Sequence, residues 1–262
     1  MYYCSCKSER WNRKNNHLCK FRDWTCQGRK KVLLVDADAQ GSMAVSLGVR
    51  EPDNLDYTIV NIMEKVINEK DIADREGVMH HEEGVDFIPA NIELAGLETA
   101  LVEVMSREFI LKLYLDSIKE NYDYILIDCM PSLGMVTINA LVAADYVLIP
   151  VEAAYLPTKG LQQLIKTIGK VHRRLNPSLE ILGILLTKVD RRTNFSKDIC
   201  DQIREVYGRH IHIFENCIPM SIRAAETSAE GRSIYYYDPK GIVAEGYQSL
   251  TKEVMKNEKQ KC

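Results

Sequence analysis

The sequence predicts an α/β protein in which a mostly parallel central sheet is covered by helices on both faces. Short apolar runs at residues 32–35, 124–128 and 146–151 are rich in Val, Leu and Ile, as expected of strands that are buried on both faces. Segments with helical apolar spacing lie between these runs. Strands that alternate with helices along a chain form parallel sheets.

This alternation extends along the chain from residue 31. Residues 71–84 are polar and are predicted to form a loop, and no repeat or internal linker divides the rest, so residues 31–262 are expected to form one domain. The predicted strands are 32–35, 85–88, 124–128, 146–151, 179–187 and 211–214. The predicted helices are 42–47, 57–69, 92–105, 108–118, 135–143, 158–173, 195–207 and 241–255.

The composition is that of an ordinary globular protein, with 46% hydrophobic and 27% charged residues among 262. No apolar run approaches the ~18 residues of a membrane span, and there is no secretion signal, so we expect a cytoplasmic protein without membrane contact. Eight cysteines in such a chain indicate reduced thiols. The net charge of −3 hides an asymmetry, because residues 1–31 carry +7 and the remainder −10.

Acidic side chains follow two of the predicted strands. Asp36, Asp38 and Gln40 come after the run at 32–35, and Asp128 closes the run at 124–128 before a turn that contains Pro131 and Gly134. Open α/β sheets bind ligands outside the carboxyl ends of their strands. A strand that ends in Asp beside such a turn is typical of the magnesium side of phosphate-transfer sites. The alternative is a pair of core strands that enter solvated loops.

The first thirty residues differ from the rest of the chain. They contain both tryptophans and show no amphipathic period of either kind. A zinc site is one interpretation, although the ligand spacing matches no common zinc motif. A basic tail that binds nucleic acid is a second interpretation. The candidate zinc ligands are Cys4, Cys6, His17, Cys19 and Cys26.

We favour a third interpretation, in which this segment comes from a gene read one base out of frame. Suitable codons for residues 7–16, read one base later, encode NQKGGTGKTT, and the same shift through residues 17–30 gives TCVSLGIGLAREGK. Trp11 and Trp24 have a single codon, and each forces a glycine-type GG at the right place. KGGTGKTT is a phosphate-binding loop, in which backbone N–H groups, a lysine and a threonine hydroxyl hold phosphates and Mg²⁺. The chain as written lacks this loop, and its first strand and first helix are expected to be missing or disordered.

From residue 31 to about residue 248 the chain resembles the ParA/Soj partition ATPases, a deviant P-loop family of the MinD/ParA superfamily. The resemblance implies a P-loop NTPase-like fold with ATP and Mg²⁺ as ligands. It also implies ATP-dependent homodimerisation, non-specific DNA binding at the nucleoid, and hydrolysis stimulated by a ParB-like partner. The motifs that carry it are VLLVDADAQGS, VDFIPANIELAGLE, YDYILIDCMPSLGMVTINAL, ADYVLIPVEAAYLPTKGLQQL, GILLTKVDRRTN and IPMSIRAAETSAEGRSIYYYDPKG.

The resemblance also implies roles for individual residues. Asp38 matches the catalytic acid that positions the attacking water, and Asp128 matches the acid that acts indirectly at the Mg²⁺ site. Residues that match nucleotide-binding and switch positions are Asp36, Gln40, Pro131, Gly134, Thr187, Asp190 and Pro219. Residues that match the DNA-binding surface, or lie beside it in a basic loop, are Arg191, Arg192 and Arg223.

The missing phosphate loop is the departure from the family pattern. Phosphate binding depends on converging backbone N–H groups, so its loss is expected to remove most nucleotide affinity. Residues 1–30 are therefore interpreted as an aberrant basic segment before a ParA-like ATPase domain at 31–262, with hydrolysis impaired. The alternative is a nucleotide-independent DNA-binding or protein-interaction module. A membrane role like that of MinD is disfavoured, because residues 249–262 contain few bulky apolar side chains.

Overall fold

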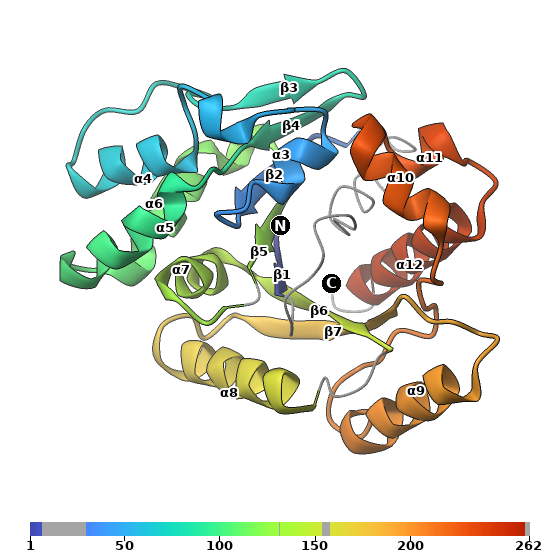
Figure 1. The fold of residues 1–262 in the computed structure, drawn as a ribbon. Coiled ribbons are helices and arrows are strands. Elements are labelled where there is room, and N and C mark those ends of the chain that lie inside the picture. The colour runs from blue at the N-terminus through green and yellow to red at the C-terminus, as the bar shows by residue number, and fades with distance from the viewer. Residues whose placement is uncertain (7–29, 131, 154–157, 260–262) are drawn as a thin grey trace.

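The computed structural model describes residues 1–6, 30–130, 132–153 and 158–259. Within this part of the chain, one seven-stranded sheet has the spatial order β3-β4-β2-β5-β1-β6-β7 (Figure 1). All neighbouring strands are parallel except β3, which is antiparallel to β4. This architecture confirms the predicted α/β fold. The strands are β1 (Tyr2–Cys6), β2 (Val32–Ala37), β3 (Met79–His81), β4 (Val85–Ile88), β5 (Tyr124–Cys129), β6 (Tyr146–Glu152) and β7 (Glu180–Thr187).

Helices cover both faces of the sheet and form two hydrophobic cores. One core contains side chains from helices α4, α5, α6, α7, α8 and α9, together with alternate strand residues such as Leu33 and Val35. The other core contains side chains from helices α3, α10, α11 and α12, together with the strand residues in between, such as Val32 and Leu34. The helices are α3 (Ser42–Ser46), α4 (Ile59–Ile67), α5 (Glu93–Ala100), α6 (Ile110–Ile118), α7 (Met135–Ala143), α8 (Thr158–Arg174), α9 (Asn194–Tyr207), α10 (Ile222–Glu230), α11 (Ile234–Tyr237) and α12 (Ile242–Lys259).

The expectation that the first strand is missing is wrong. Residues 2–6 form β1 in the middle of the sheet, between β5 and β6 (Figure 1). YYCSC contains no charge, and its side chains alternate: Tyr3 enters one core and Cys4 the other. Such alternation with aromatic residues suits a strand, and two neighbouring strands satisfy its backbone. The first helix of the family pattern, which was also expected to be missing or disordered, would fall within residues 7–29, outside the described residues.

Smaller differences concern the edges of the fold. The predicted strand at 211–214 is only an isolated bridge between Ile184 and Ile213. The polar loop at 71–84 contains the short strand β3, in which His80 Nδ1 lies 2.7 Å from Asp86 Oδ1. The segments that form α10 and α11 were not predicted to be helical. Among the described residues, no helix has the length and apolarity needed to cross a membrane.

The position of β1 makes Tyr3 a test of the fold. Tyr3 is 3% exposed, and its ring centroid lies 5.5 Å from that of Tyr146 and 6.2 Å from that of Tyr124. Tyr3→Ala is expected to lower the free energy of unfolding by about 3 kcal/mol, because it leaves a cavity beside two strands. Urea unfolding followed by circular dichroism measures this change. Met105→Ala, at a side chain that is 89% exposed, is the matched control and is expected to change little. A loss below about 1 kcal/mol for Tyr3→Ala would contradict a central β1.

Candidate functional site

Carboxylates gather at the carboxyl edge of the sheet where β2 and β5 end. Asp36 and Asp128 are register partners on these parallel strands, so their side chains lie on the same face. They are 0% and 1% exposed. Asp38 follows two residues later, just beyond the end of β2, and is also buried. The structure thus brings together the three acids that the sequence predicts for this edge.

The two acids at the carboxyl end of β2, Asp36 within the strand and Asp38 just beyond it, have different surroundings. Asp36 Oδ1 accepts a hydrogen bond from Asp38 N, and Asp36 Oδ2 accepts one from Met43 N, both at 3.1 Å. Asp36 therefore ties the end of β2 to the first turn of α3. Asp38 Oδ1 accepts a hydrogen bond of 3.1 Å from Gln40 N. This bond lies close to solvent, because Gln40 is exposed. Asp36 is placed to hold the loop, whereas Asp38 lies nearer to solvent.

Gly41 makes the tight turn between these acids and α3. Its φ is +57°, a left-handed conformation that glycine adopts without strain. A Cβ at this position would also lie 2.9 Å from Ala90 O and from a ring carbon of Pro52. Glycine at position 41 therefore allows the chain to turn tightly between Asp38 and α3, beside the residues that follow β4.

A serine that sequence reasoning missed completes the row of polar side chains. Ser5 on β1 is the register partner of Asp128 on β5, and Asp128 is the partner of Asp36 on β2. All three are at most 1% exposed and face the core that contains α3 and α12. The signal available in the sequence was the uncharged stretch YYCSC, which the charged residues after it obscured.

A second group of predicted residues lies at the end of β7 and in the loop that follows it. Thr187 is 0% exposed and donates a hydrogen bond through Oγ1 to Val151 O at 3.2 Å. Asp190 accepts two hydrogen bonds from the Arg192 guanidinium, at 3.0 and 3.2 Å, and one from Arg192 N at 3.0 Å. These bonds hold the pKa of Asp190 below its usual range. Asp190 is therefore an anion that is already paired within its own loop.

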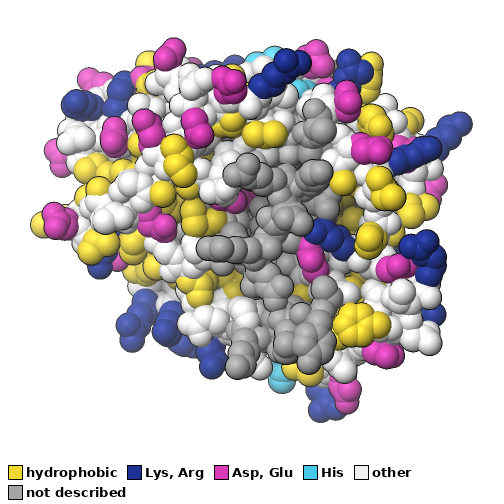
Figure 2. Space-filling view, in the orientation of Figure 1, with side chains coloured by type: hydrophobic (Ala, Val, Ile, Leu, Met, Phe, Trp, Pro, Cys, Tyr) yellow, Lys and Arg dark blue, Asp and Glu magenta, His cyan; other side chains and the backbone are white. Residues whose placement is uncertain are grey.

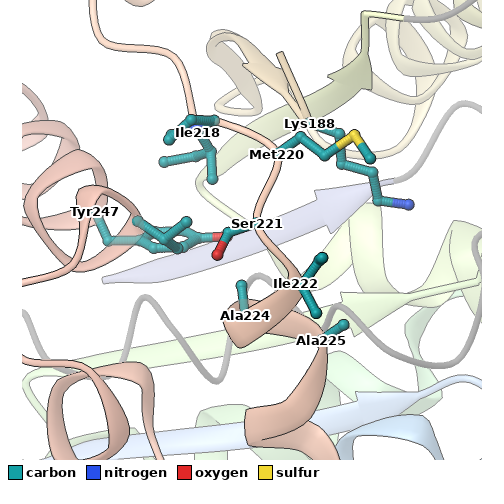
Figure 3. Close-up of a pocket in the computed structure, with 10 residues that line it drawn as sticks. Lys188, Ile218, Met220, Ser221, Ile222, Ala224, Ala225 and Tyr247 are labelled. Atoms are coloured by element: carbon teal, nitrogen blue, oxygen red, sulfur yellow. The ribbon is translucent and has the colours of Figure 1, made fainter. Parts of the chain in front are cut away.

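An apolar pocket opens beside this loop. It has a volume of about 260 Å³ and is lined by Ile218 and Tyr247 on one side and by α10 on the other (Figure 3). Pro219 forms a parallel bridge with Val189, so the segments that follow β7 and precede α10 run together. Lys188 lines the rim with a left-handed backbone, φ +51°, and forms an ion pair with Glu152. A mostly apolar pocket with a few polar groups at its rim can accept a heteroaromatic ring.

The paired segments also bring the predicted DNA-binding residues onto one side. Arg192 and Arg223 have side chains that are 87% and 67% exposed, and Arg223 pairs with Asp238 at 3.0 Å. Arg191 Nη2 lies 3.8 Å from Cys217 Sγ. Across the face in Figure 2, basic and acidic side chains are intermixed around the margin, so no extended basic field is visible there.

The two groups of site residues are separated by the ends of β1 and β6. Three strand spacings between β5 and β7 correspond to about 14 Å. Asp128 and the pocket beside Pro219 therefore lie at distant points of one edge, which an elongated ligand can span. Pro131 lies outside the described residues, and Gly134 precedes α7 as its N-cap residue.

The residues present fit a nucleoside triphosphate and Mg²⁺ only in part. The apolar pocket has a volume of about 260 Å³, and the Asp128 carboxylate offers oxygen atoms of the kind that Mg²⁺ prefers. Among the described residues no cluster of three or more His, Cys, Asp or Glu is arranged to hold a metal ion. Gly28 is the only glycine in residues 1–30 of the sequence, so a glycine-rich cradle for the phosphates cannot follow β1.

The hydrogen bonds predict losses of stability of different size when the two neighbouring acids are replaced. Asp36→Ala leaves two buried N–H groups without their acceptor and is expected to lower the free energy of unfolding by about 2–4 kcal/mol. Asp38→Ala removes one bond near the surface and is expected to cost less than about 1 kcal/mol. Thermal and urea unfolding of both variants measure the difference. Equal losses would contradict a structural role that is confined to Asp36.

Comparisons with known proteins agree with this geometry. The AAA domain family matches residues 24–181. The chain is 41% identical over 228 residues to the sporulation initiation inhibitor protein Soj of Bacillus subtilis, covering 87% of each chain. It is 38% identical over 231 residues to the chromosome partitioning protein ParA of Myxococcus xanthus, covering 87% of this chain and 78% of that one.

Solved structures share the fold. A Mycobacterium smegmatis cobyrinic acid a,c-diamide synthase with bound ATP analogue and magnesium superposes with a TM-score of 0.86 at 28% identity, over 100% of this chain and 96% of that one. Apo McdA from Cyanothece superposes with a TM-score of 0.81 at 19% identity, over 97% and 98% of the two chains, which supports the fold alone. On the strength of its sequence relatives, the chain belongs to the ParA/Soj family of partition ATPases within the MinD/ParA superfamily.

Proposed function

We propose that this chain derives from a chromosome- or plasmid-partition ATPase and is impaired, as written, in its nucleotide step. In the working form ATP would drive dimerisation, the dimer would bind DNA without sequence specificity, and a ParB-like protein would stimulate hydrolysis. The observation that carries this proposal is the Asp36–Asp128 register pair, with Asp38 beside it, at the edge where α/β sheets bind ligands.

The proposed impairment comes from the residue types in segment 7–30 and not from a defect in the sheet. Asp38, as the proposed catalytic acid, and Asp128, as the proposed magnesium-side acid, are held by β2 and β5. The proposed base pocket beside Pro219 is held by β7 and α10. Between them the phosphates of a nucleotide would need converging N–H groups and a lysine, and residues 7–30 supply no glycine-rich turn. We therefore infer that the aberrant segment is a frame-shifted phosphate loop and first helix.

Replacing residues 7–30 by NQKGGTGKTTTCVSLGIGLAREGK provides the direct test. We expect this restored variant to bind MgATP at least about 100-fold more tightly than the chain as written, because it regains several charge-assisted hydrogen bonds. Equilibrium dialysis with labelled ATP measures affinity, and phosphate release measures hydrolysis.

Asp38→Ala in the restored variant is the control, which is expected to retain MgATP and to lose turnover. Equal MgATP affinity in the restored variant and the chain as written would refute the proposed impairment. The nucleotide sequence across codons 7–30 is an independent test, since an in-frame phosphate loop one base away is required.

The second candidate function is a nucleotide-independent nucleic-acid-binding module. Residues 1–31 carry a net charge of +7, and electrostatic contacts to phosphates need no nucleotide. This module would bind DNA equally well with and without ATP, whereas the partition ATPase would bind DNA only in its ATP-bound form. A comparison of DNA affinity in the two conditions, using the chain as written and the restored variant, separates the two functions.

DNA binding by the restored variant is expected to depend on the basic residues that follow β7, including Arg223 at the start of α10. Arg223→Ala should weaken binding of the restored variant about three- to tenfold and reduce the salt slope of log K by about one, because one phosphate contact is lost. Lys119→Ala is the matched control, because Lys119 lies before β5, at the end of the sheet where the parallel strands begin. Fluorescence anisotropy across a salt series measures both quantities. An unchanged salt slope for Arg223→Ala would exclude this surface.

A further inference from the structure

The end of the turn that joins β5 to α7, at Gly134, is held from outside by a side chain on α5. Val136 N, in the first turn of α7, donates a hydrogen bond to Glu98 Oε1 at 3.4 Å. The same carboxylate lies over Gly134, where a Cβ would overlap Oε1 and come within 2.6 Å of Cδ. Gly134 has an ordinary φ of −78°. The close approach of Glu98, and not the backbone conformation, is therefore the reason that glycine suits this position.

Glu98 supplies the hydrogen-bond acceptor that the N-cap residue of α7 lacks. The first N–H groups of a helix have no partner inside it, and the helix dipole makes this end electropositive. Gly134 is the N-cap residue of α7 and has no side chain that could accept a hydrogen bond. A carboxylate from a neighbouring helix can satisfy such a terminus as an N-cap Asp or Ser would. Glu98 thus caps α7 across the gap between α5 and α7, which lie side by side in Figure 1.

The body of α7 is anchored by a separate set of contacts. Asn139 is 0% exposed; its Nδ2 donates a hydrogen bond to Arg107 O at 2.7 Å, and its Oδ1 accepts one from Leu111 N at 3.1 Å. Thr137 Oγ1, in the first turn of α7, donates a hydrogen bond to Ser132 O in the preceding segment at 2.8 Å. Because Asn139 fixes the helix to α6, a change at Glu98 acts on the turn and the first residues of α7 and leaves the rest in place.

We propose that Glu98 is a positioning residue for Gly134 and for the N-terminus of α7. Its carboxylate fixes these residues relative to Asp128, the penultimate residue of β5. The importance of Gly134 for nucleotide rests on the proposed function, because Gly134 is a proposed nucleotide-binding residue. The contact between Glu98 and α7 does not depend on nucleotide, and it can be tested in the chain as written.

Hydrogen exchange of the full chain without nucleotide tests the contact. Glu98→Ala is expected to speed exchange of the amides at 134–137 at least about tenfold, with exchange of β2 and β7 unchanged. Glu98→Gln keeps an acceptor oxygen and is expected to restore most of the protection. Glu103→Ala, an exposed acid shortly after α5, is the matched control and should have no effect. Exchange at 134–137 that is the same in Glu98→Ala and the parent would overturn the proposal.

A double-mutant cycle provides a second readout that a general loss of stability would not produce. Gly134→Ala pushes the Glu98 carboxylate away, so it is expected to raise the unfolding constant about fivefold in the parent chain and less than twofold in the Glu98→Ala background. Equal effects in both backgrounds would refute the contact. Neither experiment uses nucleotide, so failure of the restored variant to bind ATP would leave this inference intact, and its own failure would leave the proposed function intact.

Discussion

The parallel register of β2, β5 and β1 is the constraint on which the site depends. It aligns Asp36 with Asp128 and Asp128 with Ser5, so polar side chains from three distant parts of the sequence form one row. A shift of one residue in any of these strands would turn its side chain to the opposite face, because the side-chain period of a strand is two. Burial of Leu33, Leu34 and Leu126 on the two faces opposes such a shift. The cores therefore fix the chemistry of the edge.

The sequence predicted β2, β5, β6 and α7 closely because their apolar runs have one plausible period. The bounds of α7 and β4 agree with the predicted ranges 135–143 and 85–88. The sheet edge at β3 and the bridge at Ile213 could not be predicted well, since short peripheral segments take their conformation from a neighbouring strand. The three acids of the edge could be predicted from strand ends, whereas Ser5 could not, because nothing local distinguishes it.

The strand β1 and the absent phosphate loop illustrate two different demands on sequence. A central strand needs alternating side chains of suitable size, and both neighbours supply hydrogen-bond partners for its backbone. Tyr3 and Cys4 meet that demand although they match no predicted pattern. A phosphate cradle needs glycines at particular positions so that successive N–H groups converge on one anion. An arbitrary change of sequence therefore preserves the strand far more readily than the cradle.

The same contrast applies to the two groups of candidate site residues at the carboxyl ends of the strands. Asp38 and Asp128 depend on the ladder of β2 and β5, while the pocket beside Pro219 depends on the bridge to Val189 and on packing against α12. Affinity for a ligand that spans this edge is different, because it requires all contacts at once and loses the interaction free energy of any group that is missing. A change in residues 7–30 would therefore affect fold and binding in different ways.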